Sequence, residues 1–174
     1  MVSIVTTTGF ATADFNLWPD STRTLLVSVM VIGGCAGSTA AGFKIARALI
    51  AWRAAMREVR LTYRLNSVIS VSVDGTSVPE DSVRGVVALF FLWIIAWIVG
   101  ALLLSIGEAD ILTAGTASIA TLSNIGPGLG MVGPVGDFAF FSDWQKAVMI
   151  LLMWLGRLEF FALLAIMHPR FWRR

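Results

Sequence analysis

The chain has 174 residues, of which 57% are hydrophobic and only 14% charged, and its mean hydropathy is +0.81. About a quarter of the residues in an ordinary soluble domain are charged, so this composition excludes a water-soluble globular protein and indicates an integral membrane protein. The net charge of +2 is too small to indicate a nucleic-acid-binding protein, and the single cysteine, Cys35, excludes an intrachain disulfide.

The first element along the chain is a glycine loop at residues 6–11, with the sequence TTTGFA. An outer turn through Trp18, Pro19 and Asp20 follows it, and after this turn comes the first long apolar stretch. A Thr-Thr-Gly sequence occurs in many loops, so taken alone this segment is best explained as an extracellular turn. The elements that follow it along the chain give it a more specific meaning.

Residues 25–51 are the first long apolar stretch, and a segment at residues 33–42 that contains four glycines interrupts it. Each glycine costs a helix roughly 1 kcal/mol, and irregular backbone persists at membrane depth only where protein or a water-filled cavity satisfies its polar groups. The pattern therefore predicts two half-helices around an intramembrane loop that faces a pore. The alternative is a small-residue packing face, because Gly33 and Gly37 also fit GxxxG, and the two interpretations can coexist.

Basic residues set the expected orientation, because positive charge is enriched on the cytoplasmic side of a membrane protein. Residues 66–81, with Gly75 and Pro79, predict a cytoplasmic loop with room for a short hairpin. Acidic residues then fall near the expected outer ends of the spans. The basic residues are Lys44, Arg47, Arg53, Arg57, Arg60 and Arg64 after the broken stretch, and Arg170, Arg173 and Arg174 at the C-terminus. The acidic residues are Asp14, Asp20, Asp110, Asp137 and Asp143.

Residues 86–106 form a stretch of 21 residues without a charge. About 20 apolar residues, at about 1.5 Å of rise each, cross a hydrocarbon core of about 30 Å. This stretch therefore predicts a transmembrane helix. The alternative, a buried helix of a soluble protein, fits a stretch of this length poorly.

Residues 111–122 are moderately apolar but too short to cross a bilayer, and they lead into a second glycine loop at residues 123–130, SNIGPGLG. A short helix that ends in a glycine-rich extended turn and leaves the membrane on the side it entered is a re-entrant pore loop. Glycine permits the dihedrals that point successive carbonyls in one direction. Rings of such carbonyls replace the hydration shell of a monovalent cation.

Residues 148–167 are long enough to cross, but they carry Arg157 and Glu159. Each ionisable group near the centre of a membrane helix costs roughly 2.5–3.5 kcal/mol, so such groups face a cavity or a partner rather than lipid. Residues two apart on a helix point to different faces. We therefore favour an interior-facing Arg157 over an interhelical salt bridge, and the role of Glu159 stays open.

The order of loop, outer turn and inner helix thus occurs twice in the chain. Gly9 and Gly126, the central glycines of the two loops, lie 117 positions apart. The two copies share little sequence identity, so the repeat is an inference from element order and hydropathy. Either loop alone is a weak signal, but both precede an inner helix with pore-type anomalies.

At these residues the chain resembles a known family, the bacterial Trk/Ktr potassium-uptake membrane subunits of the TrkH type. The resemblance rests on four segments, of which the second and third are specific in combination, and it covers nearly the whole chain. The segments are TTTGF at residues 6–10, IGGCAGSTAAGFK at 32–44, SNIGPG at 123–128 and GRLE at 156–159.

The resemblance implies an all-α integral membrane fold with four repeats of outer helix, pore loop and inner helix around one pore. Each repeat contributes a re-entrant filter loop with a central glycine, so Gly9 belongs to the third repeat and Gly126 to the fourth. The ion-binding residues implied for the selectivity filter are Thr7, Thr8, Gly9, Phe10, Asn124, Ile125, Gly126, Pro127 and Gly128.

The resemblance also implies a gate. In the family an intramembrane loop interrupts the third inner helix, and a basic residue on the fourth inner helix acts as an electrostatic barrier below the filter. The usual Ala-Gly-Gly after Ser-Thr is Ala40-Ala41-Gly42 here, a departure that would stiffen the loop. The implied gate residues are Gly33, Gly34, Gly37, Ser38, Thr39, Gly42 and Arg157.

The partners implied by the resemblance are the remaining half of the pore, a second full-length subunit in a homodimer, and a cytoplasmic nucleotide-binding ring subunit. We expect contact with membrane lipid, a location in the inner (plasma) membrane and a cytoplasmic C-terminus. Nucleic acid is not an expected partner. No cofactor and no metal beyond the transported potassium ion are expected.

The chain divides into three expected parts. Residues 1–65 hold the filter strand and broken inner helix of the third repeat, residues 66–82 the cytoplasmic loop, and residues 83–174 the fourth repeat. The first two repeats, and the outer and pore helices of the third, have no counterpart in the sequence. Because two filter strands cannot encircle an ion, we expect the chain to be a fragment of a longer subunit.

The sequence therefore predicts potassium transport through a backbone-carbonyl filter, by the C-terminal half of an uptake subunit that is not an enzyme. No Ser/His/Asp constellation or phosphate-binding loop is evident, and Cys35 has no partner for a metal site. One alternative is a non-conducting membrane module that binds or regulates a partner subunit. Another is a secondary transporter built from broken helices, which would lack a second pore loop. Selectivity for potassium over sodium stays open.

Overall fold

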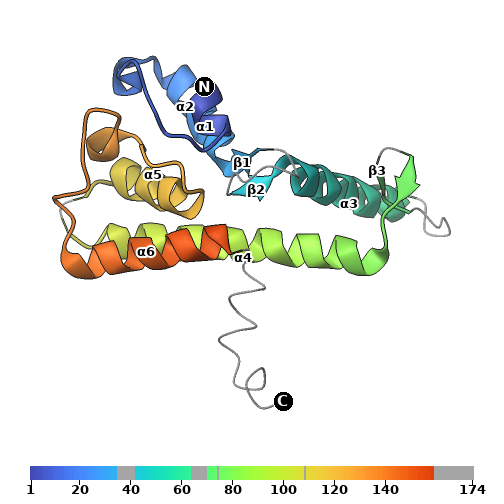
Figure 1. Cartoon of the computed structure of the whole chain (residues 1–174). Coiled ribbons are helices and arrows are strands. Elements are labelled where there is room, and N and C mark those ends of the chain that lie inside the picture. Colours follow the sequence, from blue (N-terminus) through green and yellow to red (C-terminus); the bar gives the residue numbers. More distant parts are fainter. Residues whose placement is uncertain (35–41, 64–69, 74, 108, 159–174) are drawn as a thin grey trace, which may run out of the picture.

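The computed structural model describes residues 1–34, 42–63, 70–73, 75–107 and 109–158. This part of the chain is predominantly helical (Figure 1), and two pairs of two-residue strands are a feature that the predicted all-α fold omits. The helices are α1 (Val2–Val5), α2 (Asp20–Val31), α3 (Ile45–Tyr63), α4 (Glu80–Leu104), α5 (Ile111–Leu122), α6 (Asp143–Arg157) and two 3-10 helices, Phe15–Leu17 and Gly130–Val132. The strands are β1 (Ile32–Gly33), β2 (Phe43–Lys44), β3 (Ser72–Val73) and β4 (Thr76–Ser77).

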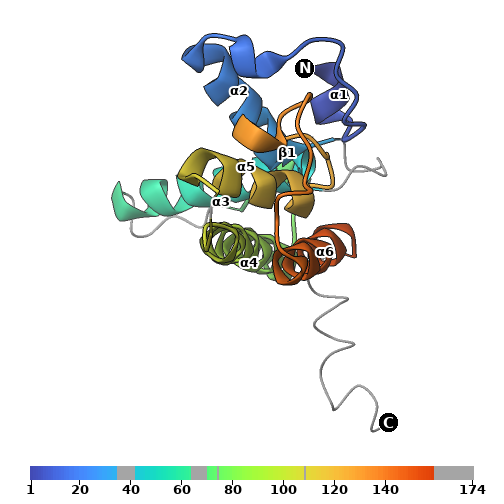
Figure 2. The same cartoon turned by 90° about the vertical axis from the view of Figure 1, so that its left-hand side faces the viewer.

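Helices α4, α5 and α6 form one packed unit. Figure 2 shows α4 and α6 side by side with α5 across them, and Figure 1 shows that α4 and α6 run in opposite directions. Nine of the twelve residues of α5 are buried, so α5 is the centre of this unit. The Ser118 hydroxyl donates to the Trp97 carbonyl at 2.9 Å, and the Trp97 indole N–H donates to the Gly115 carbonyl at 3.1 Å. These two bonds fix α5 against α4.

Helix α4 has the length and surface of a membrane-crossing helix. Within the described ranges it is the one helix both long and apolar enough, with 25 residues and a mean hydropathy of 2.8 along its apolar part. Only 17% of that part is buried, and Phe91, Ile95 and Leu102 are among its exposed side chains. An exposed apolar surface of this kind is stable against lipid rather than water. The helix coincides with the span predicted at residues 86–106, although it begins earlier, at Glu80.

The interruption predicted in the first apolar stretch is confirmed. Helix α2 ends at Val31 and α3 begins at Ile45. Between these helices β1 and β2 pair in parallel, with Ile32 opposite Phe43 and Gly33 opposite Lys44. The end of α2 and the start of α3 therefore lie next to each other. The predicted gate residues Gly37, Ser38 and Thr39 lie outside the described residues.

Helix α3 differs from the prediction at its far end, because it continues to Tyr63 instead of ending near Ala51. It carries several arginines, and its residue Ala54 packs in a buried cluster with Val71 and with Val83 of α4. An amphipathic helix of this kind is stabilised by packing of its apolar face. The predicted hairpin within residues 66–81 is confirmed, since β3 and β4 pair antiparallel.

Helix α6 also differs from the span predicted at residues 148–167. It begins at Asp143, because Ser142 and Gln145 form a capping box that satisfies backbone N–H groups of its first turn. It ends at Arg157, where the backbone of Leu158 departs from helical geometry with ψ of 6°. Residues from 159 onward lie outside the described part of the chain.

Candidate functional site

The two glycine loops, residues 6–11 and 123–130, have the same local backbone conformation. Each follows a short helix, α1 or α5, and the second residue of each is a non-glycine residue of left-handed conformation, Thr7 with φ of 53° and Asn124 with φ of 52°. Two residues later comes a glycine of positive φ, which is Gly9 at 78° in the first loop and Gly126 at 108° in the second. Left-handed conformations are unusual for residues other than glycine. Their recurrence at one spacing indicates a repeated structural element.

The hydrogen bonds at the two helix ends also match. In both loops two backbone N–H groups close the left-handed cap known as a Schellman motif, which satisfies carbonyls at the end of the helix. Each residue of the first motif corresponds to a residue 117 positions later, the offset of the two glycines. The bonds run from Thr7 N to Ile4 O (3.1 Å), Thr8 N to Ser3 O (2.9 Å), Asn124 N to Thr121 O (3.0 Å) and Ile125 N to Ala120 O (2.9 Å).

The two glycine loops touch each other. A Cβ atom on Gly9 would overlap the carbonyl oxygen of Ile125 and would lie 3.2 Å from Cδ of Pro127. Gly126 lies differently, because it is exposed and nothing lies within 4 Å of the place a Cβ would take. At position 9 both the lack of room for a Cβ atom and the positive φ favour glycine. At position 126 only the positive φ favours glycine. Phe10, at the edge of the first loop, is 83% exposed.

A side chain that the sequence pattern did not indicate joins the segment after the first glycine loop to the end of the second loop. Asn16 donates from its amide nitrogen to the Gly130 carbonyl at 3.0 Å, and its amide oxygen accepts from the Gly130 N–H at 3.0 Å. A two-bond contact of this kind sets both the distance and the orientation of the two segments. An asparagine in a polar turn is so common that its type and position gave no signal of this role.

Two threonines of α5, also missed, hold the chain as it leaves the second glycine loop. The Thr116 hydroxyl accepts from the Leu129 N–H at 3.0 Å, and the Thr113 hydroxyl accepts from the Met131 N–H at 3.2 Å. Both threonines are almost fully buried. A buried hydroxyl needs a hydrogen-bond partner. Two threonines at i, i+3 on a buried helix therefore predict hydrogen bonds to neighbouring segments, but the sequence does not indicate which groups are the partners.

The ends of the predicted gate segment lie beside the second glycine loop. Gly33 and Gly34 are buried, and a Cβ atom on Gly42 would lie 3.5 Å from the Ser123 hydroxyl oxygen and 3.6 Å from Cα of Gly33. Gly42 has φ of 88°, a conformation that favours glycine. The Ser123 hydroxyl is buried and has no hydrogen-bond partner among the described residues. The structure thus brings together both ends of the segment and the first residue of the second loop.

Helix α6 contacts the same region from another side. The Asn124 side chain donates to the Met153 carbonyl at 3.1 Å, and a Cβ atom on Gly156 would overlap the carbonyl oxygen of Leu122. Arg157 follows as the exposed last residue of α6. The carboxyl end of α5 therefore contacts both regions that the sequence assigns to gating.

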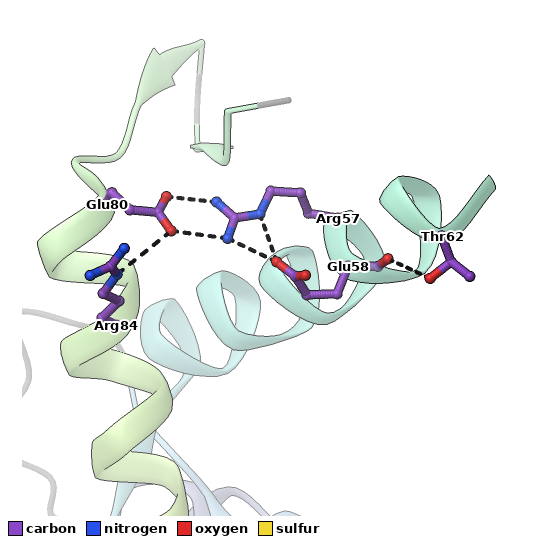
Figure 3. A network of polar contacts seen from close by, with 5 residues as sticks. All are labelled: Arg57, Glu58, Thr62, Glu80 and Arg84. Atoms are coloured by element: carbon purple, nitrogen blue, oxygen red, sulfur yellow. Dashed lines mark hydrogen bonds and ion pairs between the residues drawn. The ribbon is translucent and has the colours of Figure 1, made fainter. Parts of the chain in front are cut away.

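A network of charged side chains joins α3 to the first turn of α4 (Figure 3). The Arg57 guanidinium donates to both carboxylate oxygens of Glu80, at 2.6 and 3.0 Å, and to Glu58 at 3.0 Å, while Arg84 lies 4.0 Å from Glu80. The hydrogen bond to Glu80 is the largest cause that raises the pKa of Arg57, followed by the hydrogen bond to Glu58. A two-bond pair of this geometry ties α3 to the start of α4.

We expect Glu80→Arg to destabilise the contact between α3 and α4, because it places a third cation beside Arg57 and Arg84. The melting temperature of the full-length protein in detergent should fall below that of the wild type. The swap Arg57→Glu with Glu80→Arg should recover most of the loss. Reversing Asp143, whose 3.8 Å pair with Lys146 lies within α6, is the matched control and should have a smaller effect. Equal losses for the two reversals would contradict the role of the network.

Comparisons with known proteins agree on one family. A family model described as TrkH, cation transport protein, matches residues 1–173. The potassium uptake protein TrkH of Vibrio parahaemolyticus is 40% identical over 172 residues, and TrkH of Salmonella typhimurium is 36% identical over 173 residues. Each alignment covers 99% of this chain and 35% of the relative, so the chain spans about a third of the length of these curated relatives.

A solved structure gives the same result. The crystal structure of the potassium transporter TrkH from Vibrio parahaemolyticus is similar with a TM-score of 0.87 and 40% sequence identity. The similarity covers 99% of this chain and 36% of that one.

Proposed function

Because this chain belongs to the TrkH family of cation transport proteins, we propose that it supplies two of the filter loops of a potassium pathway across a membrane. The relatives named above are potassium uptake proteins, and the chain corresponds to about a third of each. The remaining filter loops therefore belong to parts of a longer subunit that this chain does not include.

The observation that carries the proposal is the contact between two loops of the same backbone conformation. In each loop a left-handed cap turns the chain sharply out of a short helix, and a glycine of positive φ follows two residues later. This turn lets peptide oxygens point toward one axis, where they replace the hydration shell of a cation. The filter residues are Thr7, Thr8, Gly9 and Phe10 in the first loop and Asn124, Ile125, Gly126, Pro127 and Gly128 in the second.

A gate below this filter is the second part of the proposal. Gly33, Gly34 and Gly42 lie at the two ends of a segment that interrupts the inner helix next to Ser123, and the segment also contains Gly37, Ser38 and Thr39. A movable segment at this place would open or close the path of a cation leaving the filter. Arg157 would place a positive charge near the same path, which raises the energy of a passing cation.

The membrane location, the orientation and the partners of the chain are proposed from the family and from the pattern of charged residues. The full-length subunit lies in the inner (plasma) membrane with its C-terminus in the cytoplasm, where positive charge is enriched. It pairs with a second copy and works with a cytoplasmic nucleotide-binding ring subunit. Potassium is the transported ion, and no cofactor takes part.

Flux of radioactive rubidium into vesicles that contain the full-length protein tests this function. We expect uptake above that of empty vesicles, with external potassium competing more strongly than external sodium. Equal competition by the two ions would contradict a potassium filter. No uptake at all would favour the alternative, a membrane module that binds or regulates a partner without conducting.

A further inference from the structure

The left-handed residue of the second glycine loop has a side-chain contact outside its own loop. Asn124 donates from its amide to the Met153 carbonyl at 3.1 Å, although 29 positions separate the two residues. Asparagine is one of the few residues other than glycine that adopt a left-handed conformation at low cost. Asn124 can therefore shape the loop with its backbone and hold α6 with its side chain.

A second contact fixes the same turn of α6. Gly156 lies three residues after Met153, so both face the end of α5. No Cβ fits on Gly156, because it would overlap the Leu122 carbonyl oxygen and lie 3.2 Å from the Asn124 amide nitrogen. Arg157 is the next residue and the last of α6. The position of the turn that carries Arg157 is thus set by direct contact with the residues before and at the start of the filter loop.

Among the described residues, the first glycine loop shows no such connection. Its corresponding residue, Thr7, has nearly the same φ, 53° against 52°, but its side chain makes no hydrogen bond within the described ranges. Threonine has no side-chain amide, so the left-handed conformation at this point does not require one. The amide of Asn124 is an addition in the second loop and not a requirement of the conformation.

We propose that Asn124 is a positioning residue that couples the second filter loop to the α6 turn bearing Arg157. A displacement of that turn pulls on the Asn124 amide and so shifts the peptide oxygens of the filter. In the same way, a cation in the filter favours one position of Arg157. This inference rests on the proposed function, because it assigns the coupling to a filter and a gate residue.

The first test separates the two roles of Asn124 in the full-length protein. Asn124→Gly keeps the left-handed conformation and removes the amide. Thr76→Ala is the control outside both loops, because it removes the hydroxyl that donates to the Val73 carbonyl at 2.8 Å in the β3–β4 turn. Rubidium flux under potassium or sodium competition gives the discrimination between the two ions. We expect Asn124→Gly to lower this discrimination by about three- to tenfold, the change that corresponds to one hydrogen bond. Thr76→Ala should lower it by less than about twofold.

The second test asks whether the effect passes through the turn that carries Arg157. In an Arg157→Ala background, Asn124→Gly should change flux much less than it does in the wild type, because coupled residues give non-additive effects. Gly156→Ala displaces the same turn from the side of α6 and should lower discrimination as Asn124→Gly does. Asn124→Thr also removes the amide, and threonine already adopts this conformation at Thr7, with φ of 53°. It repeats the first test if Asn124→Gly does not fold.

Three results would overturn the coupling. They are equal effects of Asn124→Gly and Thr76→Ala, full additivity with Arg157→Ala, and unchanged discrimination in Gly156→Ala. Each requires a wild-type protein that conducts potassium, so each leaves the proposed function intact. Absence of flux in the wild type would instead contradict the proposed function itself, together with the coupling that rests on it.

Discussion

Replacement of Gly126 by serine in the full-length protein is expected to lower potassium flux by about tenfold, the factor that corresponds to about 1.4 kcal/mol. Gly126 has φ of 108°, a conformation that costs a residue with a side chain about 1–3 kcal/mol. Open space surrounds the position of its Cβ, so the substitution is sterically allowed and the protein should fold. The strain instead changes the direction of the neighbouring peptide oxygens, which lowers discrimination between potassium and sodium.

Gly75→Ser is the matched control for this prediction. Gly75 has φ of 79° in the turn of the β3–β4 hairpin, and nothing lies within 4 Å of its Cβ position. The same substitution thus introduces a comparable conformational cost far along the chain from either glycine loop. Rubidium flux should stay near the wild-type value in Gly75→Ser. If Gly126→Ser also leaves flux and ion discrimination unchanged, Gly126 is not a filter residue.

Replacement of Gly9 by alanine is expected to have a larger effect on stability. The left-handed conformation of Gly9 costs alanine roughly 1–2 kcal/mol, and overpacking against a neighbour typically adds about 1–3 kcal/mol. The atom it meets is the backbone carbonyl oxygen of Ile125, which cannot move aside as a side chain does. The two loops must separate, so both the melting temperature and the flux should fall.

Gly115→Ala distinguishes this overlap from a general effect of removing a glycine. Gly115 lies in α5, has ordinary helical dihedrals, and has nothing within 4 Å of its Cβ position. Alanine is favoured over glycine in a helix by up to about 1 kcal/mol, so this variant should be neutral or slightly more stable. Thermal unfolding in detergent, followed by rubidium flux, compares the two variants. Wild-type stability of Gly9→Ala would show that the loops do not touch at this point in the full-length protein.

Much of the local structure could be predicted from the chain alone. The helix at residues 111–122, the apolar helix containing residues 86–104 and the interruption after Val31 lie where apolar run length and glycine density place them. Helix ends were less predictable, because α6 begins at a capping box and α3 continues on the packing of Ala54. These ends depend on individual hydrogen bonds and contacts, which average hydrophobicity does not describe.

The sequence by itself determined the class of protein, the family and the places of the two glycine loops. Those properties follow from composition and from residues that are neighbours along the chain. Only the tertiary structure decided that Gly9 meets Ile125, that Asn16 pairs with Gly130, and that Asn124 holds α6. The physical reason is that an amide side chain can hydrogen-bond to many different groups, and a glycine can adjoin many different groups, so the residue type does not identify the contact. The packing of the N-terminal segment against the end of α5 selects the partners of Gly9 and Asn16, over separations of up to 116 positions. The packing of α6 against α5 selects the partner of Asn124.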